Sequence, residues 1–306
     1  MSQVPGCEDP VVPVLRSAVL LDAPLPTVAA ALRDVGVLQR AAAGHAAEQA
    51  TGHIAGGSEP VDADPQSGAG RLLGTGDEVA LQVQCAPGIR LPMRLRATSV
   101  ALDRLGSTLV AGPPARLAHT GVLAATAGGT LLTTEIDWAC PGGRAVDVLV
   151  SRRLVRTVLG RHQQQISARA AHLAAAAEVA AAAVLGRHGR VLVQQRARPA
   201  AMAGRWELPG GQVEPGESAR DALVRECHEE LAVTVVPGAQ LGPDVPLPGG
   251  RVLRVYRAAL AEPGARPVAV EHAALRWVAA AELTELDWLD ADRVVLPDLE
   301  LALRAG

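Results

Sequence analysis

Alternating apolar and polar residues predict several β-strands in the first half of the chain. In "EVALQVQC", Val79, Leu81 and Val83 alternate with polar or small residues, and in "MRLRAT" the apolar positions alternate with arginine and threonine. The stretches "VPVLRSAVLL" (12–21) and "TLLTTEIDW" (130–138) are also strand-like. A period of two is typical of antiparallel strands that bury one face and expose the other.

Helical spacing appears on both sides of these strands. Pro24 and Pro26 suit a helix entrance, and Val28, Leu32 and Val35 follow at helical intervals. Residues 55–76 are rich in Gly, Pro and Asp and predict a loop. From about 144 to 173 a long helix is expected, with Leu154, Val155, Val158 and Leu159 on one stripe and arginines around it.

A long C-terminal helix laid across an antiparallel sheet resembles the SRPBCC superfamily, the START-like or polyketide-cyclase-like helix-grip fold. The resemblance covers about residues 12–173 and includes "LDAPLPTVAAAL" and "GGTLLTTEIDW", but no catalytic signature. It implies a cavity between helix and sheet, and therefore an apolar small molecule as a partner. The alternative is a packed α+β domain without a ligand.

A change of pattern near 174–178 predicts a domain boundary. Helical "AAHLAAAAE" gives way to two apolar runs separated by His188-Gly189, which indicates a β-hairpin. With 306 residues, the chain has room for about two domains. We therefore predict a two-domain α+β protein, divided into 1–175 and 176–306.

The stretch "GGQVEPGESARDALVRECHEELAV" (210–233) carries the chemistry. Ser218 and Asp221 form a capping box, so a helix should begin at about Ala219. At about 100° per residue, Glu226 and Glu230 fall within or beside the apolar stripe of this helix, and Glu229 flanks it. Carboxylates that repel one another and face the protein body require a compensating cation.

Arg225 precedes Glu229 by four residues and could hold it, but one guanidinium cannot neutralise three acids. Mg²⁺ prefers carboxylate, carbonyl and water oxygens, and Gly210 can bring a backbone carbonyl close to such an ion. The sequence therefore predicts a metal site at Gly210, Glu226, Glu229 and Glu230, with Mg²⁺ as the ion and Mn²⁺ as the alternative. Such a site would address phosphate oxygens.

This stretch resembles the Nudix box, G-x5-E-x7-R-E-U-x-E-E-x-G-U, where U is aliphatic. The fixed positions are occupied by Gly211, Glu217, Arg225, Glu226, Glu229 and Glu230. Cys227 stands at the first aliphatic position, and Ala232 replaces the last glycine, which could strain the turn if that position needs a positive φ. The resemblance implies an α/β/α sandwich with a mixed sheet and a hydrolase of phosphoric anhydride bonds; a chance acidic helix or a degenerate, inactive Nudix fold are the alternatives.

The likeness extends over about 178–304 and narrows to the MutT-like branch. It implies that Arg196 contacts substrate phosphates, that Glu271 binds metal or accepts a proton from water, and that Asp292 touches the base. With Arg225, Glu226 and Glu229, Glu271 would form the catalytic set. The competing interpretations are a solvated Arg196, a solvated Glu271 and an Asp292 that caps the helix "RVVLPDL". Trp206 or Trp288 could stack on a base, although core packing is the simpler assignment for each.

The implied reaction is the Mg²⁺-dependent hydrolysis of a nucleoside triphosphate to a monophosphate and pyrophosphate. The substrate would be a modified dNTP such as 8-oxo-dGTP, or a cytidine-type nucleotide. Other Nudix substrates, such as ADP-ribose or a dinucleoside polyphosphate, are the enzymatic alternative. A small-molecule-binding protein, acting through the N-terminal domain, is the alternative of a different class.

Composition narrows the partners further. The net charge is -3 and no basic stripe is present, which argues against a nucleic-acid polymer. Cys7, Cys85, Cys140 and Cys227 form no CxxC pair, which argues against a zinc site. The N-terminus lacks the pattern of a signal peptide, and no apolar run is long enough to span a bilayer. These features predict a soluble cytoplasmic protein that does not bind membranes.

Overall fold

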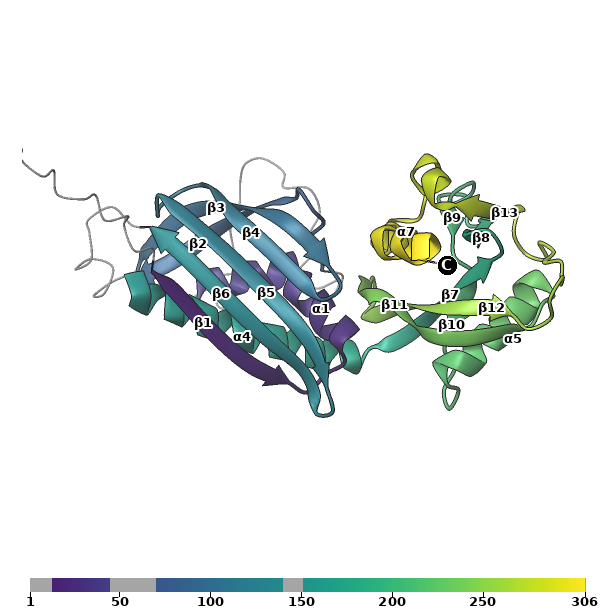
Figure 1. Ribbon diagram of the computed structural model, residues 1–306, viewed down its shortest axis with the longest axis horizontal. Helices are drawn as coiled ribbons and strands as arrows, with labels where there is room; N and C mark the ends of the chain where they lie inside the picture. Colours follow the sequence, from purple (N-terminus) through teal and green to yellow (C-terminus); the bar gives the residue numbers. More distant parts are fainter. Residues whose placement is uncertain (1–12, 45–69, 140–150, 306) are drawn as a thin grey trace, which may run out of the picture.

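The computed structural model describes residues 13–44, 70–139 and 151–305. Two parts, each built around one β-sheet, lie side by side along the long axis of the molecule (Figure 1). Runs of consecutive strands are separated by helices, and the class is α+β. The predicted loop at 55–76 is described only from Gly70 onward, and Cys7 and Cys140 lie outside the described residues.

The N-terminal sheet is antiparallel throughout and has the strand order β1-β6-β5-β4-β3-β2. Its strands are β1 (Val14–Leu21), β2 (Glu78–Ala86), β3 (Ile89–Ala101), β4 (Arg104–Ala111), β5 (Arg116–Thr126) and β6 (Gly129–Ala139). Val79, Leu81 and Val83 are each at most 7% exposed, so the alternation in β2 points its apolar face into the core. The four predicted strands are present, whereas β4 and β5 were not predicted.

Two short helices follow β1 where one helix was expected. Helix α1 (Leu25–Arg33) begins at the proline pair, as predicted, but ends before Asp34. The side chain of Asp34 accepts hydrogen bonds from the backbone N–H groups of Gly36 (2.8 Å) and Val37 (3.2 Å), and so starts α2 (Val35–Ala43). The same carboxylate accepts a hydrogen bond from Nε of Arg169 at 2.8 Å, which ties this corner to the long helix.

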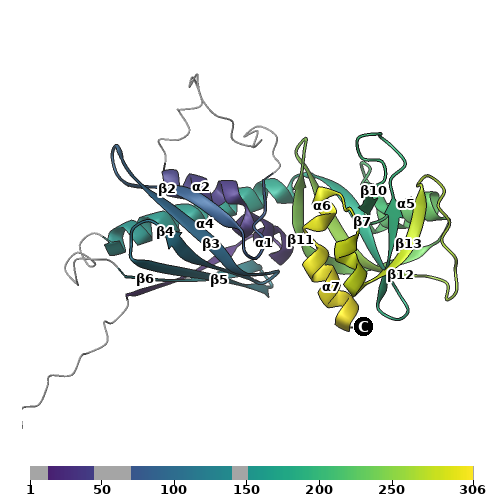
Figure 2. The same ribbon diagram turned by 90° about the horizontal axis from the view of Figure 1, so that it is seen from above.

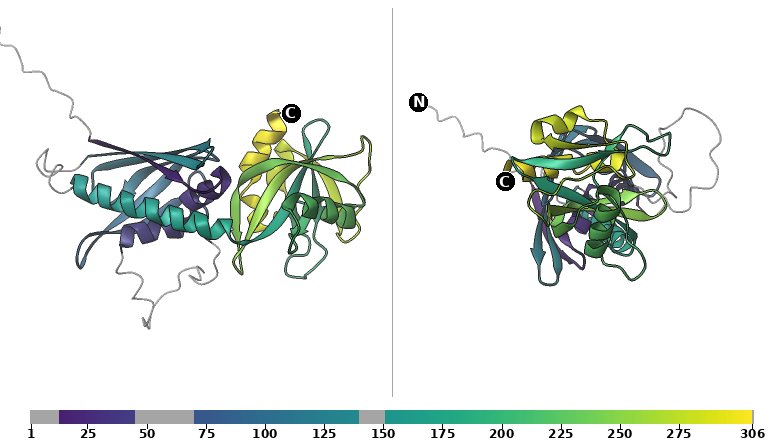
Figure 3. Two further views of the ribbon diagram at one scale, coloured as in Figure 1. Left: turned by 90° about the horizontal axis from the view of Figure 1, so that it is seen from below. Right: turned by 90° about the vertical axis from the view of Figure 1, so that its right-hand side faces the viewer.

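The long helix α4 (Arg152–Ala174) runs along the face of the sheet that carries the core (Figures 2 and 3). The first part of the predicted helix, from 144 to 150, lies outside the described residues. The predicted stripe of Leu154, Val155, Val158 and Leu159 faces inward and lines a cavity of about 320 Å³ between α4 and the sheet.

The C-terminal sheet is mixed, as predicted, because β12 runs parallel to β7 while the other pairs are antiparallel. Its central order is β11-β12-β7-β8-β13, with β10 added to β7 and β9 to β8. The strands are β7 (Ala177–Gly186), β8 (Arg190–Gln195), β9 (Trp206–Glu207), β10 (Gly210–Gln212), β11 (Val235–Leu247), β12 (Arg251–Leu260) and β13 (Ala274–Ala279). The predicted β7–β8 hairpin is present, and three residues, Arg187 to Gly189, connect the paired residues Gly186 and Arg190. His188 and Gly189 have positive φ angles of 63° and 60° in this turn.

Helices cover both faces of this sheet. Helix α5 (Ala219–Leu231) buries Leu223, Cys227 and Leu231 against one face. The 3₁₀ helix η3 (Ala280–Glu285) and helices α6 (Asp290–Arg293) and α7 (Leu296–Ala305) cover the other face. Trp288 is 1% exposed in that second core and donates from Nε1 to the carbonyl of Leu283 at 2.6 Å, so it packs in the core rather than facing a base.

The two parts share a buried junction at α1, the end of α4 and strands β11 and β12. Ala30, Leu173 and Val252 form a small apolar cluster there. Asp244 is fully buried and accepts hydrogen bonds from Oγ1 of Thr27 (2.9 Å) and Nη2 of Arg254 (3.1 Å). The buried carboxylate of Asp244 thus has hydrogen-bond donors from both parts, as buried polar groups require. The contact between the two parts is therefore a specific interface.

No helix in the described ranges is long and apolar enough to cross a membrane. Cys85 and Cys227 are free thiols, and burial raises the pKa of Cys227 to about 12. Cys227 therefore serves as a small apolar side chain on the buried face of α5.

Candidate active site

The position of the acidic residues follows from how α5 begins and ends. Ser218 caps the helix, because its Oγ accepts from the backbone N–H of Asp221 at 3.2 Å, so the predicted start at Ala219 is confirmed. The last residue of the turn, Ala232, adopts the left-handed conformation with φ 53°. The missing glycine of the motif therefore falls where a side chain is strained, as the sequence indicated.

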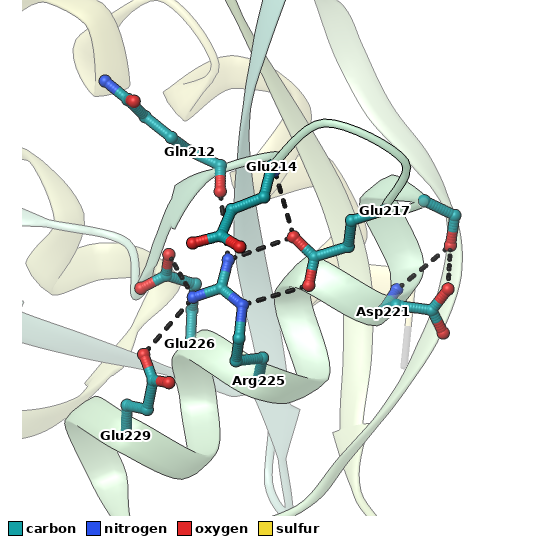
Figure 4. Close-up of polar contacts among 8 residues, drawn as sticks. Gln212, Glu214, Glu217, Asp221, Arg225, Glu226 and Glu229 are labelled. Carbon is teal, nitrogen blue, oxygen red and sulfur yellow. Dashed lines mark hydrogen bonds and ion pairs between the residues drawn. The ribbon is translucent and has the colours of Figure 1, made fainter.

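Arg225 is the centre of the acidic cluster (Figure 4). Its Nη1 donates to Oε1 of Glu226 at 2.9 Å and to Oε2 of Glu229 at 3.3 Å. Its Nε and Nη2 donate to the two oxygens of Glu217 at 3.0 and 3.1 Å, and Nη2 also reaches the carbonyl of Gln212. These hydrogen bonds, the one to Glu217 above all, raise the pKa of Arg225, so it stays a cation throughout the accessible pH range.

Glu217 is more closely engaged with Arg225 than sequence reasoning anticipated. Besides its two bonds to Arg225, Oε2 accepts from the backbone N–H of Glu214 at 3.1 Å. The hydrogen bond from Arg225, supported by the one from Glu214, lowers the pKa of Glu217. Glu217 thus clamps the loop before α5 onto the helix and fixes the direction in which Arg225 presents its remaining N–H groups.

Glu230 points to the opposite side of the cluster, into the protein. Its Oε2 accepts from Nε2 of Gln194 (3.0 Å) and from the backbone N–H of Gly210 (3.1 Å). Burial raises the pKa of Glu230, opposed by the hydrogen bond from Gln194. The side chain of Glu229 is 55% exposed, whereas that of Glu230 is 12% exposed. Glu230 is therefore a buried carboxylate that hydrogen bonds hold in place without a full ion pair.

The two glycines before the loop are needed for space. A β-carbon at Gly211 would lie 2.1 Å from Oε1 of Glu226, and one at Gly210 would lie 2.1 Å from the carbonyl oxygen of Ala180. Gly210 also has a φ of 149°, which side chains rarely adopt. The bare backbone thus lets the Glu226 carboxylate lie against strand β10.

A buried pair that sequence reasoning missed extends this network. Nε2 of His272 lies 3.0 Å from Oε1 of Glu207, and its Nδ1 lies 3.8 Å from Oε1 of Glu230. Oε2 of Glu207 accepts from Nη1 of Arg196 at 2.8 Å. Arg196 is thereby linked to Glu230 through two residues whose only sequence signal was their place beside Glu271 and in "RWELPGG".

The remaining predicted residues differ in their surroundings. Asp292 is 5% exposed in α6, and its Oδ1 accepts from the backbone N–H of Leu208 at 3.0 Å. It does not cap α7, which begins at Leu296, so the capping alternative is wrong. Burial raises the pKa of Asp292 to about 7. Glu271 is exposed and makes no hydrogen bond or ion pair within the part of the chain that the structure describes.

Comparison with known proteins decides the family. The model of the NUDIX domain matches residues 176–299. A Mycobacterium tuberculosis protein named "Putative 8-oxo-dGTP diphosphatase 2" is 46% identical over 132 residues, which are 42% of this chain and 92% of that protein. The chain belongs to the Nudix family. It is a Nudix hydrolase, which acts on phosphoric anhydride bonds.

Two further proteins match a similar share of the chain. The CTP pyrophosphohydrolase of Escherichia coli is 36% identical over 125 residues, which are 41% of this chain and 92% of that protein. The solution structure of the E. coli ORF135 protein is 35% identical, covers 42% of this chain and 91% of that chain, and has a TM-score of 0.37.

The residues present fit the divalent metal that Nudix hydrolases generally use. Three carboxylates share the single guanidinium of Arg225, and the buried Glu230 lies beside them, so the cluster has an excess of hard oxygen donors. These are the ligands that Mg²⁺ prefers. Within the described residues no three acidic, His or Cys side chains are already gathered as around a bound ion.

Proposed function

We propose that this Nudix hydrolase is a Mg²⁺-dependent nucleoside triphosphate pyrophosphohydrolase that releases a nucleoside monophosphate and pyrophosphate. The preferred substrate would be 8-oxo-dGTP or another modified dNTP, or a cytidine-type nucleotide. The observation that carries the proposal is the cluster of Arg225 with Glu217, Glu226 and Glu229 beside the bare backbone of Gly210 and Gly211. The printed names of the M. tuberculosis and E. coli relatives support the substrate class.

In this proposal Glu226, Glu229, Glu230 and the carbonyl of Gly210 hold Mg²⁺, with Mn²⁺ as a substitute. When bound, the ion polarises phosphoryl oxygens and stabilises the leaving pyrophosphate. Arg225 keeps the carboxylates oriented and limits their mutual repulsion. Removing or weakening it would leave the acids both mobile and uncompensated.

Glu271 would be the general base. It is exposed next to His272 and free of the ion pairs that engage the other carboxylates of the site in the described structure, so it can accept a proton from water. The water oxygen forms a bond to phosphorus, and the bond from phosphorus to the pyrophosphate oxygen breaks. Arg196 would leave Glu207 in part to contact the phosphates, and Asp292, which can carry a proton near pH 7, would receive the base.

A substrate panel tests the proposal with the full-length protein. Pyrophosphate release is measured with the common NTPs and dNTPs and with 8-oxo-dGTP, and chromatography of the products detects turnover of ADP-ribose and diadenosine tetraphosphate, whose hydrolysis releases no pyrophosphate. We expect turnover of one triphosphate class to monophosphate and pyrophosphate, lost in Glu229→Gln and kept in Glu262→Gln, a matched change on the exposed loop after β12. Turnover of ADP-ribose or the dinucleotide alone would reassign the substrate, and no turnover of any compound would refute the hydrolase proposal.

The cavity of the N-terminal part supports a second function, the binding of an apolar small molecule. Its volume of about 320 Å³ falls within the range of roughly 300–1,000 Å³ that ligand sites occupy. We propose that residues 1–175 form an SRPBCC-like binding domain and 176–306 the hydrolase domain. The end of α4 at Ala174 and the start of β7 at Ala177 support this division.

A further inference from the structure

The cavity under α4 is lined almost entirely by aliphatic side chains. They come from α1, α2, α4 and strands β2 to β6, and none of the described lining residues carries a fixed charge. Packed cores contain few voids larger than a water molecule. A space of about 320 Å³ with an apolar wall is therefore a site to be filled rather than a packing defect.

Two histidines interrupt this apolar wall. His119 of β5 and His162 of α4 line the cavity with their ring centroids 6.1 Å apart and their planes at 63°. His162 is 6% exposed, and the Nε2 atom of each ring is inaccessible to solvent. Neither Nε2 has a hydrogen-bond partner in residues 13–44, 70–139 and 151–305.

Buried polar atoms without a partner are rare in folded proteins and require an explanation. Here both histidines line the same cavity, so a molecule bound there can supply the missing partner once a small turn of the ring exposes Nε2 to it. Burial lowers the pKa of His119 to about 4 and that of His162, which also lies beside His119, to about 3. Both rings are therefore neutral at pH 7 and offer no cation to an anionic ligand.

The chemistry of neutral imidazole narrows the ligand. Each ring has one N–H donor and one acceptor nitrogen, and which nitrogen carries the proton depends on its partner. A hydroxyl group both donates and accepts, so it can pair with Nε2 in either tautomer. A carboxylate would lose its hydration in an apolar cavity without a compensating charge, which is strongly unfavourable.

We propose that the cavity binds an uncharged, mainly apolar molecule whose hydroxyl group hydrogen-bonds to Nε2 of His119 or His162. This inference rests on the second proposed function and adds to it the chemical class of the ligand and the residues that select it. It does not depend on the nucleotide substrate of the other half.

Three probes built on the same ring system separate the contributions of the apolar ring, a hydroxyl group and a charge: naphthalene, 2-naphthol and 2-naphthoate. Binding to the full-length protein at pH 7.5 is measured by titration calorimetry. We expect 2-naphthol and naphthalene to bind and 2-naphthoate to bind at least tenfold more weakly than 2-naphthol. In the double variant His119→Leu, His162→Leu the affinity for 2-naphthol should fall roughly tenfold, because about one hydrogen bond is lost. The affinity for naphthalene, which makes no hydrogen bond, should change by less than about twofold.

His172→Leu is the matched control, because His172 lies exposed on the same helix and does not line the cavity. If the double variant does not fold, ¹⁵N NMR of the unaltered protein replaces it, and 2-naphthol but not naphthalene should shift two histidine Nε2 resonances. If no probe binds, the binding function itself is wrong. If naphthalene binds but neither the variant nor the NMR spectrum distinguishes 2-naphthol, or if 2-naphthoate binds equally well, the cavity binds ligands but the histidines do not select them.

Discussion

Glu217 and Arg225 are eight residues apart, and the carboxylate of the first accepts two hydrogen bonds from the guanidinium of the second, at 3.0 and 3.1 Å. This two-pronged contact leaves Nη1 of Arg225 directed at Glu226 and Glu229. One side chain thereby joins the loop before α5 to the acids on the helix. The geometry depends on the planar fork of arginine, which a lysine ammonium lacks.

Arg225→Lys should therefore lower kcat/KM by about 10- to 100-fold, although the charge is retained, because the carboxylates lose their common support. Steady-state kinetics with the best triphosphate substrate at saturating Mg²⁺ measure this. Arg220→Lys is the control, since Arg220 lies on the same helix, is exposed and, among the described groups, hydrogen-bonds only to the carbonyl of Pro237. Equal kcat/KM values for Arg225→Lys and the unaltered protein would contradict the assigned role.

Gly211→Ala should displace the Glu226 carboxylate, because the added carbon would lie 2.1 Å from Oε1. We expect at least a tenfold loss of kcat and a higher Mg²⁺ requirement, with the fold kept, since a carboxylate side chain can rotate away. Mg²⁺ titration of activity and circular dichroism test both parts. Gly160→Ala, where no atom lies within 4 Å of the added carbon, should leave kcat unchanged; an unaffected Mg²⁺ requirement in Gly211→Ala would argue against the metal site.

Asp292 should make the stability of the protein decrease as the pH rises toward neutrality. Its pKa is raised by burial to about 7, against about 3.9 in an unfolded chain, so between these values the folded state binds more protons. The stabilisation is complete below about pH 4 and is lost as the pH passes about 7. Asp292→Asn keeps an oxygen for Leu208 but does not ionise, so relative to the unaltered protein it should gain about 1–3 kcal/mol between pH 5 and pH 8.

Urea unfolding of the metal-free protein at the two pH values measures this gain. Asp290→Asn is the control, because the neighbouring Asp290 is 85% exposed and pairs with Arg205 at the surface. A constant difference between Asp292→Asn and the unaltered protein from pH 5 to pH 8 would show that Asp292 does not titrate in this range.

Ala232→Gly should stabilise the protein by about 1 kcal/mol, because it relieves a left-handed conformation with φ 53° at the end of α5. Ala219→Gly, at the other end of the same helix, should instead destabilise by roughly 0.5–1 kcal/mol. Thermal and urea unfolding give both values. A loss of stability in Ala232→Gly would mean that the alanine methyl group contributes more than the backbone strain costs.

The parts of the fold that were predictable are those specified by local pattern. The helix at 219–231 and its acids could be located because a cap, an apolar stripe and the charges occur within one short stretch. The roles of His272 and Glu207 could not be, because their contact joins residues 65 positions apart. The pairing of distant strands brings these two side chains together, and the local sequence around either residue does not indicate that pairing.

In the N-terminal half, strand β4 and the break between α1 and α2 were not predicted, because neither follows from a local apolar pattern. Strand β4 carries Leu105, Gly106 and Ser107 in succession as buried residues, so it lacks the alternation that identified β2. The break between α1 and α2 depends on the side chain of Asp34, whose capping competes with continued helix. The apolar residues keep their helical spacing across Asp34, so their pattern alone does not predict the break.

The contact between Thr27 and Asp244 bears on how this protein can be divided. Thr27 belongs to the first helix and Asp244 to the hydrolase sheet, and the apolar cluster of Ala30, Leu173 and Val252 surrounds the same seam. Cutting the chain near residue 175 and removing the N-terminal part would expose apolar surface at Val252 and would remove the hydrogen bond that Thr27 donates to the buried carboxylate of Asp244. Both proposed functions therefore depend on one buried interface. A truncated hydrolase domain would need substitutions at this interface before its activity could be compared with that of the full-length protein.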